Sequence, residues 1–212
     1  MITKELFEEF SWSVSRTAST SPKCVDRFLL HLDTFHAIIG MDTELHELRE
    51  AMTCYPGVED MDLVNLEEEI GDMLWYLELL RKSLEKYDSK TSYSLFGIFS
   101  QLSEGPEGSL QIRLAGETQW EYLYDEISTA VDHMKKVIFY GKELNVQYLN
   151  LFLGLTCGML MDIVRAASLD MENILKTNMR KLRARYPDGF EESRAANRNL
   201  EKERRAISNE VQ

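Results

Sequence analysis

The strictest pattern in this 212-residue chain is an apolar seam in its first half. Apolar side chains recur there at spacings of three and four residues, at Leu66, Ile70, Met73, Leu77, Leu80 and Leu84. Such spacing is typical of a helix that packs lengthwise against other helices. The composition agrees, because the chain has only 11 glycines and 4 prolines and is 44% hydrophobic, which is enough for a sizeable core. The predicted fold class is therefore all-α.

Further helices are predicted on both sides of this seam. Residues 1–20 are expected to begin with a short helix, and apolar periodicity predicts a long helix through Val25 to Met52, bent near Gly40. Residues 54–60 (CYPGVED) indicate a turn, and residues 88–116 a long connection with room for a strand or a short helix. Later helices are expected at 117–139, 146–167 and 170–184.

These segments predict one compact domain in four parts. Residues 1–88 carry the first helices, 89–116 a linker or insertion, 117–190 a second helical unit that ends in a cationic helix, and 191–212 a charged tail. The tail has five acidic and five basic residues and little apolar content. It is expected to be a solvated or frayed helix, or else an arm that packs on a partner subunit.

Charge and hydropathy exclude several functional classes. The net charge of −12 argues against stable nucleic-acid binding, although an anionic small molecule can still bind where cations or a metal gather. Three cysteines without CxxC spacing suggest neither a disulfide framework nor a zinc site. No signal peptide is expected, and the longest apolar run, 148–164, is interpreted as a buried core helix. A cytoplasmic protein without membrane association is the expectation.

Four carboxylates lie beside the apolar seams of two successive predicted helices. Glu44 and Glu47 are three residues apart on the first helix, and Glu69 and Asp72 are three residues apart on the second. Each pair therefore shares one helix face, and Tyr76 continues the row of Glu69 and Asp72. Two antiparallel helices packed on these seams would bring all four carboxylates together.

Four clustered carboxylates repel one another, so either the pKa of each is shifted upward or the set needs a cation. The economical choice is a hard divalent metal bound through oxygen, Mg²⁺ with Mn²⁺ as the alternative. The other interpretation is that these are ordinary boundary residues of amphipathic helices. Glu68 points away from the row and is expected to face solvent. A di-iron site is disfavoured, because no histidine follows a glutamate in Glu-x-x-His spacing.

A cationic row stands on the last predicted helix of the second unit. Asn178, Lys181 and Arg185 are spaced i, i+3, i+7 and share a face. Lysine and arginine both suit phosphate, although a basic last turn that complements the helix dipole would look the same. Carboxylates for a metal and cations for phosphate together suggest a metal–nucleotide site.

Two sequence motifs resemble a known family. TELHELREAM (43–52) followed by NLEEEIGDMLWYL (65–77) resembles the ExxE…ExxD signature of the MazG-like all-α nucleoside triphosphate pyrophosphohydrolases, which include dimeric dUTPases and dCTP pyrophosphatases. NILKTNMRKLRARYPDGF (173–190) resembles the C-terminal helix of that family. The resemblance spans roughly residues 25–87 and 117–190 and implies a four-helix-bundle-like core.

The second half resembles a degenerate copy of the first. YDEISTAVDHMKKVIFYGK (124–142) is similar to the first motif helix, with Glu126 at the first acidic position and Thr129 at the second. YLNLFLGLTCGM (148–159) is similar to the ExxD helix without its acids. The resemblance thus implies two fused units, an intrachain pseudo-dimer of helix pairs; the alternative is a single unit with unrelated extra helices. Because family members commonly form dimers, a homodimer or higher homo-oligomer is also expected.

The resemblance implies hydrolysis of a (d)NTP to a (d)NMP and pyrophosphate by metal-activated water. The implied catalytic and metal-binding residues are Glu44, Glu47, Glu69 and Asp72, and the implied substrate-binding residues are Asn178, Lys181, Arg185 and Tyr76. Some relatives have a glutamate, proposed as general base, where this chain has Thr43. Either the metals alone activate the water, or another acid such as Glu68 helps, or activity is weak.

Three functions remain open at this stage. The chain is an active nucleotide pyrophosphohydrolase, a catalytically weak nucleotide-binding or regulatory protein on the same scaffold, or a structural helical interaction protein. The residues that select a base carry no recognisable motif. Phe35, His36, Trp75 and Trp120 are candidates for base stacking, and core packing would explain each of them as well.

Overall fold

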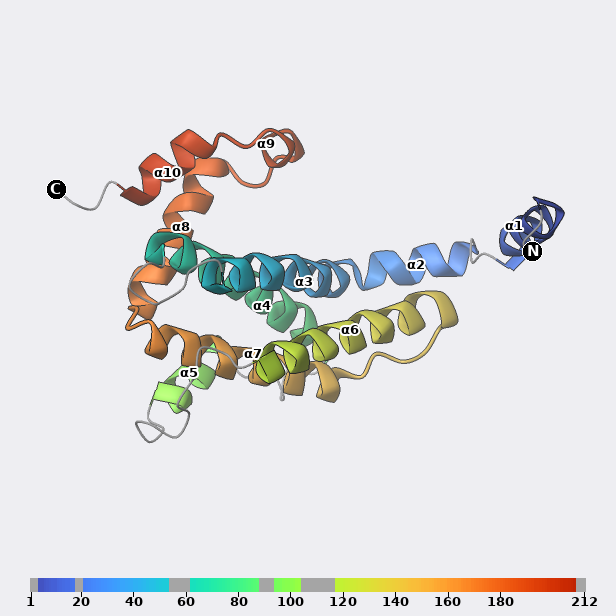
Figure 1. Ribbon diagram of the computed structural model, residues 1–212, viewed down its shortest axis with the longest axis horizontal. Coiled ribbons are helices and arrows are strands. Elements are labelled where there is room, and N and C mark those ends of the chain that lie inside the picture. The colour runs from blue at the N-terminus through green and yellow to red at the C-terminus, as the bar shows by residue number, and fades with distance from the viewer. Residues whose placement is uncertain (1–3, 18–20, 54–61, 88–93, 104–116, 209–212) are drawn as a thin grey trace.

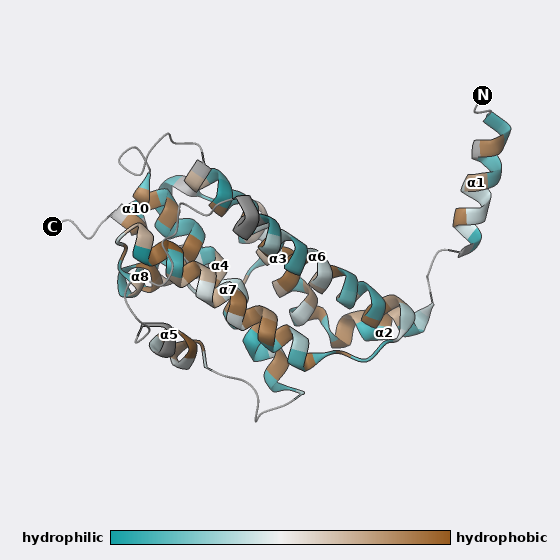
Figure 2. Cartoon of the chain, turned by 60° about the horizontal axis from the view of Figure 1, so that its bottom comes forward, coloured by the Kyte–Doolittle hydropathy of each residue, from teal (hydrophilic) through white to brown (hydrophobic). Residues whose placement is uncertain are grey.

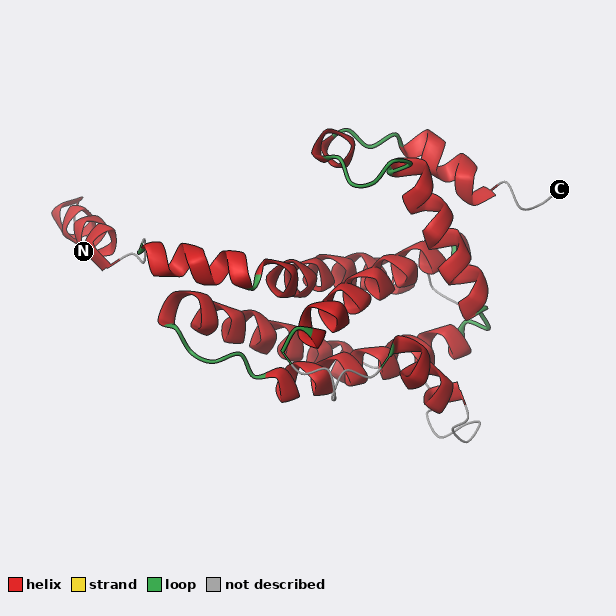
Figure 3. Ribbon diagram, turned by 180° about the vertical axis from the view of Figure 1, so that it is seen from behind, coloured by secondary structure: helices red, strands yellow, loops and turns green. Residues whose placement is uncertain are grey.

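The computed structural model describes residues 4–17, 21–53, 62–87, 94–103 and 117–208. Every regular element in these ranges is a helix, which confirms the all-α prediction (Figures 1 and 3). In chain order they are α1 (Lys4–Thr17), α2 (Pro22–Leu30), α3 (Leu32–Thr53), α4 (Leu63–Glu85), α5 (Leu95–Ser103), α6 (Glu117–Tyr140), α7 (Val146–Ala166), α8 (Met171–Arg185), α9 (Glu192–Ala196) and α10 (Leu200–Ser208).

The centre of the fold is the antiparallel pair of α3 and α4 (Figure 1), which contact each other more extensively than any other two helices. All six residues of the predicted seam on α4 are fully buried. They pack against an equivalent row on α3 that includes Met41, Leu45 and Leu48. Burial of these two rows fixes the rotation of both helices and therefore the direction in which their acidic side chains point.

The helices α6 and α7 complete a four-helix core. The helix α6 lies along α2 and α3, whereas α7 lies along α4, and the apolar residues of all four main helices form one continuous cluster. Direct contact between α6 and α7 is slight compared with that between α3 and α4. The bundle is thus observed, while its MazG type and its pseudo-dimeric origin stay predictions.

The apolar helix α7 behaves as a core element. By length and composition alone it could cross a membrane, and Figure 2 colours much of it as hydrophobic. Half of its most apolar stretch is nevertheless buried within the protein, including Phe152, Cys157 and Leu160. The burial agrees with the interpretation of residues 148–164 as a core helix.

The predicted bend near Gly40 is wrong. The helix breaks nine residues earlier, at His31, whose backbone N–H donates to the carbonyls of Arg27 and Phe28. The helix α3 then continues through Gly40, where a Cβ atom would lie only 2.1 Å from Cε1 of Tyr76. Gly40 is therefore required for a close approach of the Tyr76 ring, not for a change in backbone direction.

Residues 191–208 of the predicted tail are largely helical, and most of their described side chains are exposed. They form α9 and α10, and α10 packs on α8 of the same chain. Of the predicted connection, residues 95–103 form the short helix α5, which packs on α7. The predicted turn at 54–60 and the rest of that connection lie outside the described residues. The predicted N-terminal helix is present as α1, which lies apart from the bundle (Figures 1 and 2).

Replacement of Gly40 by alanine is expected to destabilise the fold. The new methyl group would force the Tyr76 ring out of its position, so the free energy of unfolding should fall by about 1–3 kcal/mol in urea denaturation. The matched control is Gly154→Ala in α7, where an added Cβ meets nothing within 4 Å. That substitution should stabilise the helix by up to about 1 kcal/mol. A neutral or stabilising Gly40→Ala would contradict the packing account.

Candidate functional site

Three of the four predicted carboxylates converge at the edge of the core. Each of Glu44 and Glu47 on α3 and Glu69 on α4 places one carboxylate oxygen within 4.8 Å of the other two. Glu69 is only 9% exposed, Glu44 is half-buried and Glu47 is exposed. The glutamate triad formed by these three residues therefore has a buried floor and opens to solvent on the side of Glu47.

Burial makes this triad electrostatically costly. Burial and, to a smaller extent, the charges of Glu47, Asp72 and Glu44 together raise the pKa of Glu69 to about 8. Burial likewise raises the pKa of Glu44 to about 7, with Asp72 and Glu47 acting in the same direction. Three converging carboxylates with unbalanced charge are the hard oxygen donors that Mg²⁺ and Mn²⁺ prefer, so the residues present fit a divalent cation.

The fourth predicted carboxylate, Asp72, lies beside the triad and has different partners. Its Oδ2 accepts a hydrogen bond from Nζ of Lys181 at 2.5 Å, and its Oδ1 accepts one from Nδ2 of Asn178 at 2.7 Å. The two donors come from α8, one turn apart. They fix the orientation of Asp72 and connect α8 to α4.

The expectation that Glu68 faces solvent is wrong. Its Oε1 accepts a second hydrogen bond from the Lys181 ammonium at 3.1 Å. Lys181 is 1% exposed, so this ammonium lies buried between two carboxylates of α4. A helical wheel places Glu68 relative to α3 but does not show that α8 also packs against α4. The i, i+4 spacing between Glu68 and Asp72 was the available signal.

A glycine on α4, Gly71, allows α8 to pack closely against it. A Cβ atom at Gly71 would lie 3.0 Å from Cβ and 3.1 Å from Nδ2 of Asn178. The small residue therefore allows the two helices to approach closely where Asp72 receives its hydrogen bonds. Sequence reasoning missed this role, although a glycine inside a strongly periodic helix signals a close contact.

The predicted Tyr76 belongs to an aromatic group near Glu44 and Asp72. Its ring contacts those of His36 and Trp75, with centroids 5.6 and 4.9 Å away. Burial raises the pKa of Tyr76, and the nearby charges of Glu44 and Asp72 raise it too. Of the other aromatic candidates, Phe35 packs edge-on against Phe28, whereas the side chain of Trp120 lies outside the described residues.

The third member of the cationic row, Arg185, binds a residue of the tail. Its Nε and Nη2 donate to the two carboxylate oxygens of Glu203 on α10, at 2.9 and 2.6 Å. All three members of the row thus contact acidic side chains of this chain, and phosphate binding by them stays a prediction. Sequence reasoning missed Glu203, since nothing local in a charge-rich segment indicates which acid pairs with α8.

Two further positions in the segments that resemble the family, Thr43 and Glu126, have structural partners. Thr43 is exposed and its hydroxyl donates to the carbonyl of Gly40 at 2.8 Å. Glu126, on α6, is approached by the hydroxyl of Tyr148, 3.4 Å from its Oε2. Glu126 is not a member of the triad.

The raised pKa values predict how stability depends on pH without metal. Because the folded protein holds protons on Glu44 and Glu69 up to about pH 7 and 8, while the unfolded chain loses them near pH 4.5, raising the pH from 5 to 8 favours unfolding. Glu69→Gln removes the larger contribution. Relative to the wild type, this variant should gain roughly 2–4 kcal/mol of stability over that range. A difference that is constant between pH 5 and 8 would contradict the assigned environment of Glu69.

Loss of the buried lysine is expected to be costly. Lys181→Met leaves Asp72 and Glu68 without their shared cation, so the free energy of unfolding should fall by about 3–5 kcal/mol. Lys176→Met on the same helix is the control, since Lys176 is exposed and its pair with Glu172 lies at the surface. Its effect should stay within about 0.5 kcal/mol. Equal effects of the two substitutions in urea denaturation would refute the buried ion-pair account.

A comparison with family models, curated proteins and solved structures found no match to this chain. The resemblance to the MazG-like enzymes therefore rests on the quoted motifs. The chemistry of the site rests on the positions of its carboxylates, Lys181 and Asn178.

Proposed function

We propose that this chain is a Mg²⁺-dependent nucleoside triphosphate pyrophosphohydrolase that cleaves a (d)NTP to a (d)NMP and pyrophosphate. The observation that carries the proposal is the convergence of Glu44, Glu47 and Glu69, whose carboxylate oxygens lie within 4.8 Å of one another. The same residues form three of the four acidic positions of the ExxE…ExxD motif. Motif and geometry thus support the same residues independently.

The glutamate triad would hold the divalent cation. When bound, the cation would neutralise triphosphate charge and supply an activated water. Lys181 and Asn178 hold Asp72 in a fixed orientation at the edge of the triad, so its carboxylate needs no reorganisation when a substrate arrives. The exposed Glu47 marks the side from which the substrate would enter.

A proton acceptor other than residue 43 is required in this proposal. The threonine there has no basic group, and its hydroxyl donates to the backbone at Gly40. Glu68 is the acid that lies next to Asp72 on α4, and both carboxylates contact the Lys181 ammonium. We assign Glu68 the role of accepting the proton, since it is oriented by Lys181 and is not part of the glutamate triad.

A second function is favoured by a specific observation. Lys181 and Arg185, the cations expected to bind phosphate, both contact carboxylates of this chain. With Thr43 at the position of the proposed base, this arrangement also suits a catalytically weak nucleotide-binding or regulatory protein on the same scaffold. Such a protein would bind a nucleotide and a metal and would not turn the nucleotide over.

A nucleotide panel separates the two functions. With Mg²⁺, at least one (d)NTP should yield its monophosphate and pyrophosphate, and Glu69→Gln or Asp72→Asn should reduce turnover about 100-fold or more because each alters the metal environment. Glu50→Gln, an exposed position one turn beyond Glu47, is the control and should leave turnover unchanged.

Three other outcomes have distinct meanings. Binding without turnover of any nucleotide would support the regulatory function. Absence of both metal and nucleotide binding would reject both functions in favour of a structural helical protein. Full turnover in both site variants would reject the assigned residues.

A further inference from the structure

The carboxylate of Glu203 on α10 is held by two arginines from different segments. Arg185 on α8 donates to both of its oxygens, at 2.9 and 2.6 Å, and Arg198, which precedes α10, donates to Oε2 at 3.2 Å. Glu203 is only 3% exposed. Two guanidinium groups therefore converge on one buried anion, and paired N–H groups of this kind match a phosphate as well as a carboxylate.

The net positive charge of Arg185, Arg198 and Glu203 together favours an anion with more charge than a carboxylate. Two guanidinium groups share one carboxylate, so the cluster keeps an excess of positive charge in a chain whose net charge is −12. Burial alone would raise the pKa of Glu203, but hydrogen bonds from Arg185 and Arg198 hold it below its ordinary value. A phosphate group, with more than one negative charge, would neutralise both arginines where Glu203 neutralises only one.

The two arginines lie next to the candidate active site. Arg185 follows Lys181 by four residues on the same face of α8, a rise of about 6 Å, and Lys181 binds Asp72. Arg198 is close enough to Glu44 that its positive charge opposes the larger effect of burial on that carboxyl. A phosphate chain that begins at the glutamate triad would therefore extend toward Arg185 and Arg198.

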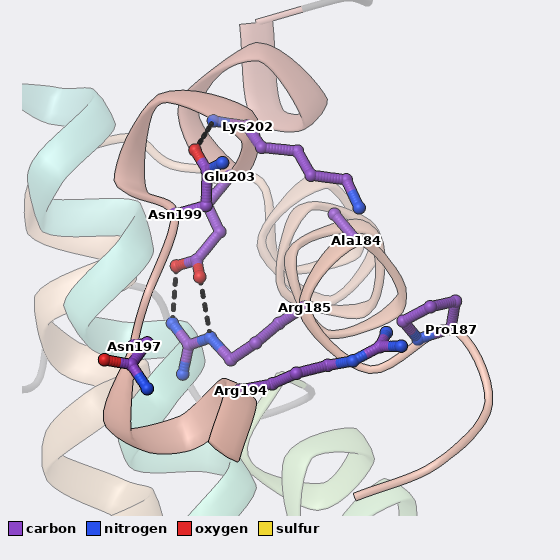
Figure 4. A pocket seen from close by; sticks show the side chains of 8 residues that line it. All are labelled: Ala184, Arg185, Pro187, Arg194, Asn197, Asn199, Lys202 and Glu203. Carbon is purple, nitrogen blue, oxygen red and sulfur yellow. Dashed lines mark hydrogen bonds and ion pairs between the residues drawn. The ribbon is translucent and has the colours of Figure 1, made fainter. Parts of the chain in front are cut away.

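A cavity of about 410 Å³ opens beside this group (Figure 4). Among the described residues that line it, Glu203 is the one acid, and Arg185, Lys202, Asn197 and Asn199 also belong to the lining. The volume falls within the range of small-molecule sites. Figure 4 shows the Glu203 carboxylate facing Arg185 and the Lys202 side chain running along the cavity toward Ala184.

We propose that Arg185 and Arg198 form a phosphate-binding site that Glu203 occupies as an internal ligand, so that a phosphate-bearing molecule binds there by displacing Glu203 and loosening α10. The inference rests on the proposed function only for the source of the phosphate, which would be the distal phosphates of the nucleotide or released pyrophosphate. Glu203 thus competes with the ligand, and the apparent affinity is lower than the intrinsic affinity of the two arginines.

Pyrophosphate binding without divalent metal tests the competition. Glu203→Gln keeps the size of the side chain and removes its charge, so it should tighten binding of pyrophosphate about tenfold in isothermal titration calorimetry. Glu201→Gln on the same helix is the matched control, because Glu201 is exposed and forms a surface ion pair with Arg205. It should leave the affinity unchanged. Weaker or unchanged binding by a folded Glu203→Gln would overturn the proposal.

Hydrogen exchange in the wild-type chain gives a test that does not depend on the variant's folding. Pyrophosphate should speed exchange of the α10 amides, whereas a purely structural Glu203 predicts unchanged or slower exchange, which would overturn the proposal. Inorganic phosphate is run in parallel; the same effect with it would place a single phosphate between the arginines, and an effect of pyrophosphate alone would place a diphosphate there. Because neither measurement requires turnover, their success alongside a failed hydrolysis assay would reject the proposed function alone.

Discussion

The buried ammonium of Lys181 is the contact on which the rest of the site depends. It lies between Asp72 and Glu68 and donates hydrogen bonds to both of these α4 carboxylates. An ammonium group without these partners would be costly to bury, and the carboxylates without the ammonium would repel each other. The docking of α8 on α4 and the arrangement of acids are therefore parts of one interaction, made close by the glycine at position 71.

The negative charges of the site's carboxylates are only partly balanced by Lys181, and this imbalance determines what the site can bind. Lys181 forms ion pairs with Asp72 and Glu68. The pKa values of Glu44 and Glu69, in contrast, are raised by burial and by neighbouring carboxylates. Their positions are fixed by the fully buried rows of α3 and α4, so the carboxylates cannot separate without disturbing the core. A rigid frame that holds like charges together stores an unfavourable energy that a cation would relieve.

The sequence predicted what local periodicity can determine. The seam from Leu66 to Leu84 and the spacing of the motif carboxylates required only helical geometry, and the bundle and the glutamate triad followed from them. The errors concern contacts between segments far apart in the chain. The role of Gly40 depends on the ring of Tyr76, and the environment of Glu68 depends on the path of α8; neither is encoded in the helix that carries the residue.

The contact between the tail and α8 is another long-range contact that local periodicity does not predict. It also changes the interpretation of the cationic row. Lys181 and Arg185 were expected to meet phosphate as bare cations, but each already contacts acids, Arg185 through Glu203. At these two cations, an anionic ligand must therefore exchange with carboxylates of the protein or bring its own cation. A divalent metal held by the glutamate triad would meet the second condition. A phosphate bound with such a metal would lie on the side of the site toward Arg185, where displacement of one carboxylate by a more highly charged anion would be favourable.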